Sequence, residues 1–174
     1  MNEFDQYCNE QMKMLEEGKL GKALATGALA AGLMASQAQG AIYNNNPGNI
    51  RTSSTTWNGE VPNHGEKFEV FETMPHGIRA SARILRTYGS KYGINTIEKI
   101  IDRYAPPSDN NPNNANYARH VANGSGFAVD EEIDLNDPNV LIKLMRPIFE
   151  FENGRKEARK ISDADIIKGV KMAF

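Results

Sequence analysis

A short polar segment, Tyr43–Arg51, places the strongest constraint on how this chain folds. It reads Tyr-Asn-Asn-Asn-Pro-Gly-Asn-Ile-Arg, which is rich in turn formers and poor in residues that pack in a core. Pro47 presets φ at the second position of a β-turn, and Gly48 supplies the positive φ that a type II turn requires at the third. The sequence therefore predicts a type II turn at 46–49 that displays amide side chains, with the rest of the chain as its scaffold.

Two interpretations of this turn remain open. Amide groups both donate and accept hydrogen bonds, which suits an uncharged polar ligand such as a sugar, and the guanidinium of Arg51 suits a carboxylate or phosphate. The alternative is a surface turn whose asparagines bond their own backbone, because clusters of Asn, Pro and Gly usually mark turns.

Length and composition argue against a nucleic-acid-binding protein, a disulfide-rich protein and a metalloprotein. At 174 residues the chain suits one domain of ordinary size plus an appendage. Its 20 basic and 22 acidic residues give a net charge of −2, so we expect no nucleic-acid partner. Cys8 is the single cysteine, and the three histidines lack the spacing of metal ligands. We therefore expect neither an intrachain disulfide nor a metal or organic cofactor.

Residues 1–40 differ from the remainder and predict a helical N-terminal extension. Apolar residues follow a helical period in its first half, at Phe4, Cys8, Met12 and Leu15. An Ala/Gly/Leu-rich stretch at 22–38 then favours close helix packing in an assembly. Transient membrane contact and a secretory signal are the alternatives. The apolar run is shorter than the roughly 20 residues that a span needs, and the acidic front end is unlike a signal.

The remainder predicts a mostly helical α+β domain at 41–174. Apolar runs and turn residues within Ile50–Glu72 indicate a small, irregular β-hairpin. Apolar periodicity, capping residues and prolines then indicate helices. We expect them at 74–92, 97–104, 114–121, 138–151 and 163–170, with Pro147 bending or weakening the fourth.

The motifs of this domain carry a family resemblance in their order and spacing. They are Asn45-Asn46-Pro47-Gly48-Asn49-Ile50-Arg51, Trp57-x-Gly59, Phe68-x-x-Phe71, Gly77-Ile78-Arg79-Ala80, Arg83-Ile84-Leu85-x-x-Tyr88, Thr96-Ile97-x-x-Ile100-Ile101, Tyr104-Ala105-Pro106-Pro107, Asp109-Asn110-Asn111, Tyr117 and Glu152-Asn153-Gly154. From about residue 44 onward the chain resembles a family of small bacteriophage virion proteins related to cell-wall-degrading, lysozyme-like enzymes. It departs from the family pattern after residue 111, where Pro112-Asn113 intervenes and Asn114 replaces a threonine.

The resemblance implies a lysozyme-like fold and a muramidase or lytic transglycosylase carried in the phage particle. Such a protein would act on peptidoglycan in the host cell envelope during genome delivery. Residues 1–40 lie outside the resemblance, and we expect them to serve virion assembly or delivery by binding other virion proteins. The chain could form a homo-oligomer within the virion. The main alternative is a non-enzymatic virion protein that keeps the lysozyme-like scaffold. A secreted cell-wall enzyme processed near Ala38 is a third.

Two glutamates are candidates for the catalytic acid. Cleavage of a glycosidic bond needs a carboxylic acid near the leaving oxygen, and a lytic transglycosylase replaces the second carboxylate with the sugar's own groups. Glu152 is the first candidate because it lies where an apolar helix ends, close to Phe149 and Phe151, and Glu69 on the expected hairpin is the second. The alternative for each is an exposed surface residue. Gln37 stands where a simple lysozyme-like layout would place the acid.

Substrate binding is expected from aromatic faces, which pack on sugar rings, and from polar groups that bond hydroxyls. Trp57 and Tyr117 could equally be core residues, and Asp109 could simply form an Asx turn. The candidate substrate-binding residues are Asn46, Asn49, Arg51, Trp57, Asp109 and Tyr117.

Overall fold

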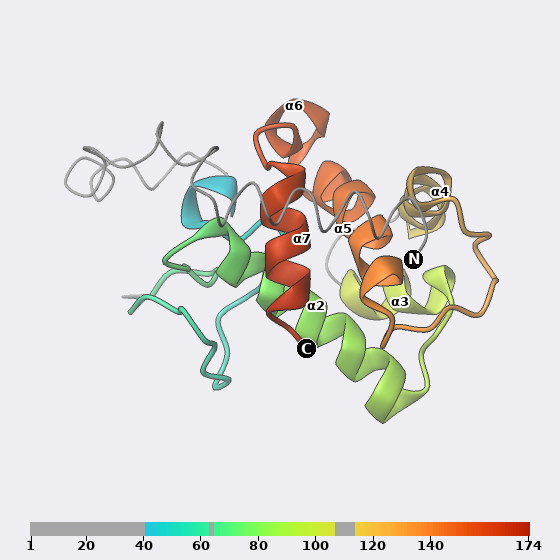
Figure 1. Ribbon diagram of the computed structural model, residues 1–174, viewed down its shortest axis with the longest axis horizontal. Coiled ribbons are helices and arrows are strands. Elements are labelled where there is room, and N and C mark those ends of the chain that lie inside the picture. The colour runs from blue at the N-terminus through green and yellow to red at the C-terminus, as the bar shows by residue number, and fades with distance from the viewer. Residues whose placement is uncertain (1–40, 63–64, 107–113) are drawn as a thin grey trace.

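The computed structural model describes residues 41–62, 65–106 and 114–174. Within these ranges the protein is mostly helical, as the apolar periodicity predicts (Figure 1). The elements are η3 (Ala41–Asn44), α2 (Met74–Tyr92), α3 (Ile97–Tyr104), α4 (Asn114–Ser125), α5 (Pro138–Asn153), α6 (Arg155–Ala158) and α7 (Asp163–Lys171). The predicted extension at 1–40 lies outside the described residues. No helix in the described ranges combines the length and apolarity that a membrane span requires.

Helix α2 is central to the packing. It contacts both α7 and α5, and it buries Ile78 and Leu85 completely. Its predicted bounds are confirmed. The helix ends at Tyr92 and is capped by Gly93, whose positive φ of 62° turns the chain so that the Ile94 N–H reaches the Tyr88 carbonyl at 3.0 Å.

The predicted starts of three further helices are confirmed by side-chain caps. Thr96 accepts a hydrogen bond from the Lys99 N–H, Asp137 caps α5, and Ser162 caps α7. Helix α5 continues through Pro147 to Asn153, so this proline does not end it. A Cβ on Gly124 of α4 would lie 2.6 Å from the Pro147 Cβ, which shows how closely α4 and α5 pack.

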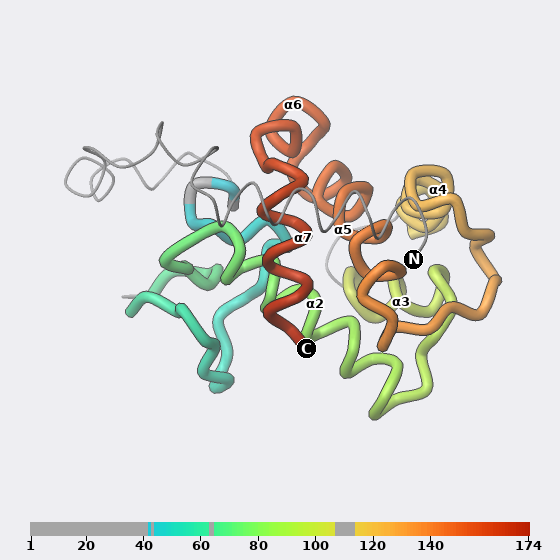
Figure 2. The backbone as a smooth tube through the Cα atoms, viewed as in Figure 1, coloured from blue at the N-terminus to red at the C-terminus, as the bar shows by residue number. Residues whose placement is uncertain are grey.

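The segment between Ile50 and Glu72 does not form the small, irregular β-hairpin that its sequence predicts. It contains two isolated antiparallel bridges, Arg51 with Phe68 and Glu60 with Phe71, and the described part contains no sheet. In the view of Figure 2 this segment lies on one side of α7, and α3 and α4 lie on the other.

The prediction of a type II turn at 46–49 is wrong. The Asn49 N–H does bond the Asn46 carbonyl at 3.1 Å, but Gly48 lacks the positive φ of that turn. Asn45 and Asn49 adopt positive φ instead, at 53° and 51°, which asparagine tolerates better than most residues. Gly48 is needed for space, because its Cβ would lie 2.4 Å from Ser81 Oγ and 2.5 Å from the Tyr104 hydroxyl.

Candidate functional site

The asparagine segment is held in shape by its own amides. Asn46 is fully buried, and its Nδ2 donates to the carbonyls of Ile50 and Glu69 at 2.9 and 3.0 Å. Its Oδ1 accepts from the Ile50 N–H at 2.9 Å, so both polar atoms of the amide already have partners inside the protein. Asn46, which is predicted to bind substrate, therefore lies in the interior and holds the loop in shape through its hydrogen bonds.

The same segment packs tightly on α2. A Cβ on Gly77 would lie 1.8 Å from the Asn45 carbonyl oxygen. The Tyr104 hydroxyl of α3 donates to the Gly48 carbonyl at 2.6 Å. Two helices therefore fix the backbone from which Asn49 projects.

The end of α5 meets this loop at Glu152. Asn49 Nδ2 donates to Glu152 Oε2 and the Tyr117 hydroxyl donates to Oε1, each at 2.8 Å. The next residue, Asn153, donates from Nδ2 to the Pro47 carbonyl at 2.7 Å. The structure thus brings together three residues predicted for the site, Asn49, Tyr117 and Glu152, from the loop, α4 and α5.

Tyr117 is a buried and well-positioned donor to Glu152. Its ring stacks on Phe151 with centroids 3.8 Å apart and planes 10° from parallel. Burial, followed by the negative charge of Glu152, raises the pKa of Tyr117 well above 10. The phenol therefore keeps its proton at neutral pH.

Glu152 borders a groove of about 590 Å³. We call it the central groove. Arg51 and Trp57, two of the residues predicted to bind substrate, also line it, together with Tyr88, Tyr104 and Phe151. The Trp57 indole Nε1 is buried and has no hydrogen-bond partner within the described residues. Aromatic faces beside polar groups suit a sugar ring with its hydroxyls.

Glu69, the second candidate acid, does not line this groove itself, although it is hydrogen-bonded to Ser53 and Ile50, which do. It is 2% exposed, and its Oε1 accepts from the Ser53 N–H at 3.1 Å. Burial raises its pKa above 4.5, the Ser53 hydrogen bond opposes this rise, and the nearby Glu60 carboxylate adds to it. Glu69 is therefore a buried residue that joins its own segment to the segment of Ile50 and Ser53 by hydrogen bonds.

Asp109 lies outside the described residues. In the described part of the chain, no three His, Cys, Asp or Glu side chains are placed to share a metal ion.

Sequence reasoning missed Asn153, Tyr104 and Phe151 as site residues. Each lies within or beside a motif used for the resemblance, since Asn153 follows Glu152 and Tyr104 begins Tyr-Ala-Pro-Pro. Their residue types give no sign that Asn153 and Tyr104 bond the loop or that Phe151 lines the groove, because these arrangements join residues far apart in sequence. Asn49 and Glu152 are separated by 103 positions.

Comparison with known proteins identifies a phage relative. The chain is 38% identical over 139 residues to Protein P5 of Pseudoalteromonas phage PM2, and the match covers 78% of this chain and 84% of that protein. No family model matches the chain. At this identity and coverage, the chain belongs to the family of phage PM2 Protein P5.

Proposed function

We propose that this protein is a phage virion component that cleaves the glycan strands of peptidoglycan, with Glu152 as its acid. The observation that carries the proposal is the position of Glu152. Its carboxyl group borders the central groove, and the Tyr117 hydroxyl and the Asn49 amide hold one oxygen each. A fixed carboxyl group beside a sugar-sized groove is what proton transfer to a glycosidic oxygen requires.

The groove also offers surfaces that suit a sugar. The faces of Trp57, Tyr88 and Phe151 provide apolar area for pyranose rings. Arg51 lies at the same groove and supplies a fork of donors. A glycan bound here would lie within reach of Glu152.

Both a muramidase and a lytic transglycosylase fit this arrangement. A hydrolase uses a second carboxylate or an activated water, whereas a transglycosylase lets a group of the sugar attack and leaves 1,6-anhydro ends. We also propose that the fold is lysozyme-like. The position of Glu152 near the end of α5, beside the polar loop of Asn49, supports this part of the proposal.

The setting in the virion is supported by membership of a phage protein family. In this proposal residues 1–40 dock the protein onto other virion proteins or touch a membrane, and the domain opens the host wall locally during genome delivery. Copies of the chain could associate within the particle.

The test is turnover of purified peptidoglycan by the full-length protein, with the released sugar ends identified by mass spectrometry. We expect muropeptide release by the wild-type protein and by Glu69→Gln, and none by folded Glu152→Gln. Reducing ends would indicate hydrolysis, and 1,6-anhydro ends a transglycosylase. Release abolished by Glu69→Gln but retained by Glu152→Gln would refute the assignment of the acid.

One observation favours a second function, that of a non-enzymatic virion protein. Both Glu152 oxygens accept internal hydrogen bonds, so this carboxyl group also joins α4, α5 and the loop. A purely structural role predicts that Glu152→Gln lowers the free energy of unfolding and the yield of infectious particles. It also predicts that the folded wild-type protein releases no muropeptides.

A further inference from the structure

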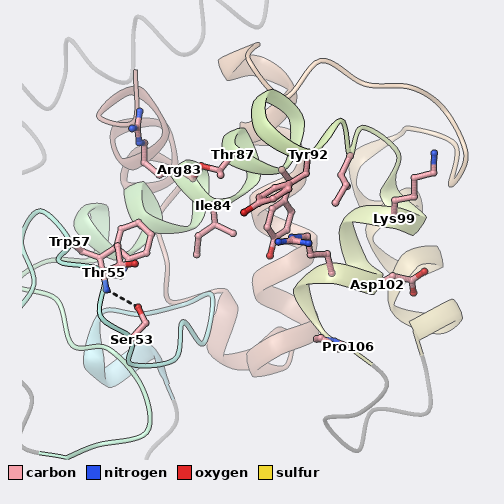
Figure 3. Close-up of a pocket in the computed structure, with 13 residues that line it drawn as sticks. Ser53, Thr55, Trp57, Arg83, Ile84, Thr87, Tyr92, Lys99, Asp102 and Pro106 are labelled. Atoms are coloured by element: carbon pink, nitrogen blue, oxygen red, sulfur yellow. Dashed lines mark hydrogen bonds between the residues drawn. The ribbon is translucent and has the colours of Figure 1, made fainter.

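A second and larger hollow adjoins the central groove. Its volume is about 1260 Å³, and it shares Ser53, Trp57, Ile84 and Tyr88 with the central groove. We call it the side groove. Figure 3 shows Ser53 and Trp57 at one side of it and Lys99 and Asp102 at the other, with Ile84 and Tyr92 between them. The two hollows therefore form one continuous surface.

Arg103 is the best-placed cation of the side groove. Its guanidinium carbon lies 4.0 Å from the Tyr92 ring centroid and 5.3 Å from that of Tyr88. Stacking on aromatic faces restrains the planar guanidinium while its N–H edge keeps the capacity to bond a carboxylate. Arg103 is itself exposed at the surface.

The remaining charges add to this positive character. Lys99 is exposed at the same hollow. Arg83 also lines it, although its Nη1 donates to the Ala173 carbonyl at 3.3 Å. Asp102 is the one acidic residue of the lining within the described chain, and its Oδ1 already accepts from Asn114 at 3.0 Å. The balance of charge favours an anionic ligand.

We propose that the side groove binds the carboxylates of the stem peptides that peptidoglycan carries on its glycan strand. This inference rests on the proposed function, because a glycan in the central groove would bring its covalently attached peptides to the adjoining surface. Attachment to the same strand raises the effective concentration of the peptide at Arg103 and Lys99. Stem-peptide recognition would favour intact cell wall over bare glycan.

The experiment compares two ligands, soluble peptidoglycan strands with their stem peptides and the same strands after an amidase has removed them. The full-length Glu152→Gln protein prevents turnover during the binding measurement. Onto it we would add Arg103→Gln, Arg103→Lys, Lys99→Gln and, as a charge-matched control, Lys168→Gln. Lys168 is exposed on α7 and lines neither groove. Thermal unfolding would confirm that each variant is folded.

We expect Arg103→Gln to weaken binding of stem-bearing strands about ten-fold, the usual scale for a lost charge-assisted hydrogen bond. Binding of bare strands should stay unchanged, and the loss should shrink at high salt. Lys99→Gln should act in the same direction, Arg103→Lys should restore part of the affinity, and Lys168→Gln should change neither ligand.

Three results would overturn the proposal. If the parent protein binds both ligands equally and Arg103→Gln changes neither, the subsite fails while glycan binding stands. If Arg103→Gln weakens both ligands alike, the side groove holds glycan instead of peptide. If the parent protein binds neither ligand, the subsite and the proposed function fail together.

Discussion

Gly77 lies in a helix where the backbone of another segment leaves no room for a methyl group. A Cβ at this position would lie 1.8 Å from the Asn45 carbonyl oxygen, and backbone cannot move aside as a flexible side chain would. Gly48 is constrained in a similar way by Ser81 and the Tyr104 hydroxyl. At the residue scale, these two glycines let the asparagine segment pack against α2 and α3.

Gly77→Ala should therefore reverse the usual effect of this substitution. In an unconstrained helix Gly→Ala stabilises by roughly 0.5–1 kcal/mol. Here we expect a loss of about 2–3 kcal/mol in the free energy of unfolding, measured by urea denaturation, because the loop must shift. Ser90→Ala, at an exposed position of the same helix, should stay within about 0.5 kcal/mol of the wild type. A stabilised Gly77→Ala would show that the loop does not pack here.

The buried carboxyl group of Glu69 predicts that the stability of the protein depends on pH. Burial raises its pKa above the unfolded value of 4.5, so its contribution to stability is full below about pH 4.5 and is lost as pH rises through the folded pKa. Glu69→Gln keeps an acceptor for the Ser53 N–H but has no charge to bury. The stability of this variant relative to the wild type should therefore increase between pH 4 and pH 7.

The check is urea denaturation of both proteins at the two pH values, with exposed Glu132→Gln as the control. A difference between Glu69→Gln and the wild type that stays constant with pH would argue against the burial of this carboxyl group.

At the element scale, the site depends on how the end of α5 is attached to the loop. Asn153 Nδ2 donates to the Pro47 carbonyl at 2.7 Å and to the Phe149 carbonyl at 3.0 Å. One side chain thus joins the last turn of the helix to the loop, directly beside Glu152. Helix α4 packs against the same end of α5 through Tyr117, which stacks on Phe151.

Asn153→Ala should weaken this attachment. We expect a loss of about 1–2 kcal/mol in the free energy of unfolding, because the Pro47 carbonyl loses its donor. Peptidoglycan turnover should fall about ten-fold, since Glu152 would be less well positioned. Asn139→Ala at the other end of α5 is the matched control. Wild-type stability and turnover in Asn153→Ala would contradict the role given to this contact.

The helices of this fold could be predicted from sequence because their signals are local. Apolar periodicity and the capping residues Thr96, Asp137 and Ser162 all lie within or beside the elements they define. The local sequence predicts the wrong turn at 46–49, because Gly48 is required by packing against α2 and α3, which the local sequence does not show.

The same distinction applies to the site. Glu152, Asn49 and Tyr117 were each singled out by residue type and motif, but their contact depends on tertiary structure. Local sequence could not rank Glu152 against Glu69. Only the fold shows that Glu152 lines a groove, while Glu69 is buried and does not line it.

At the scale of the whole molecule, the described chain is a helical scaffold that holds one irregular segment. The packing of α2 on α7 and of α4 on α5 supports the loop and the end of α5 together. The central and side grooves then form a continuous surface across the loop, α2 and α3. This arrangement fits the long polymer ligand that we propose, with the carboxyl group of Glu152 placed beside it.

The most direct test of this account is the rate of muropeptide release by Glu152→Gln relative to the wild type, at a temperature where both are folded. Loss of a general acid typically costs about 10²–10⁴-fold in rate. We predict a loss of at least about 100-fold, with Glu132→Gln unchanged. Release at the wild-type rate by folded Glu152→Gln would contradict the claim that Glu152 carries the chemistry.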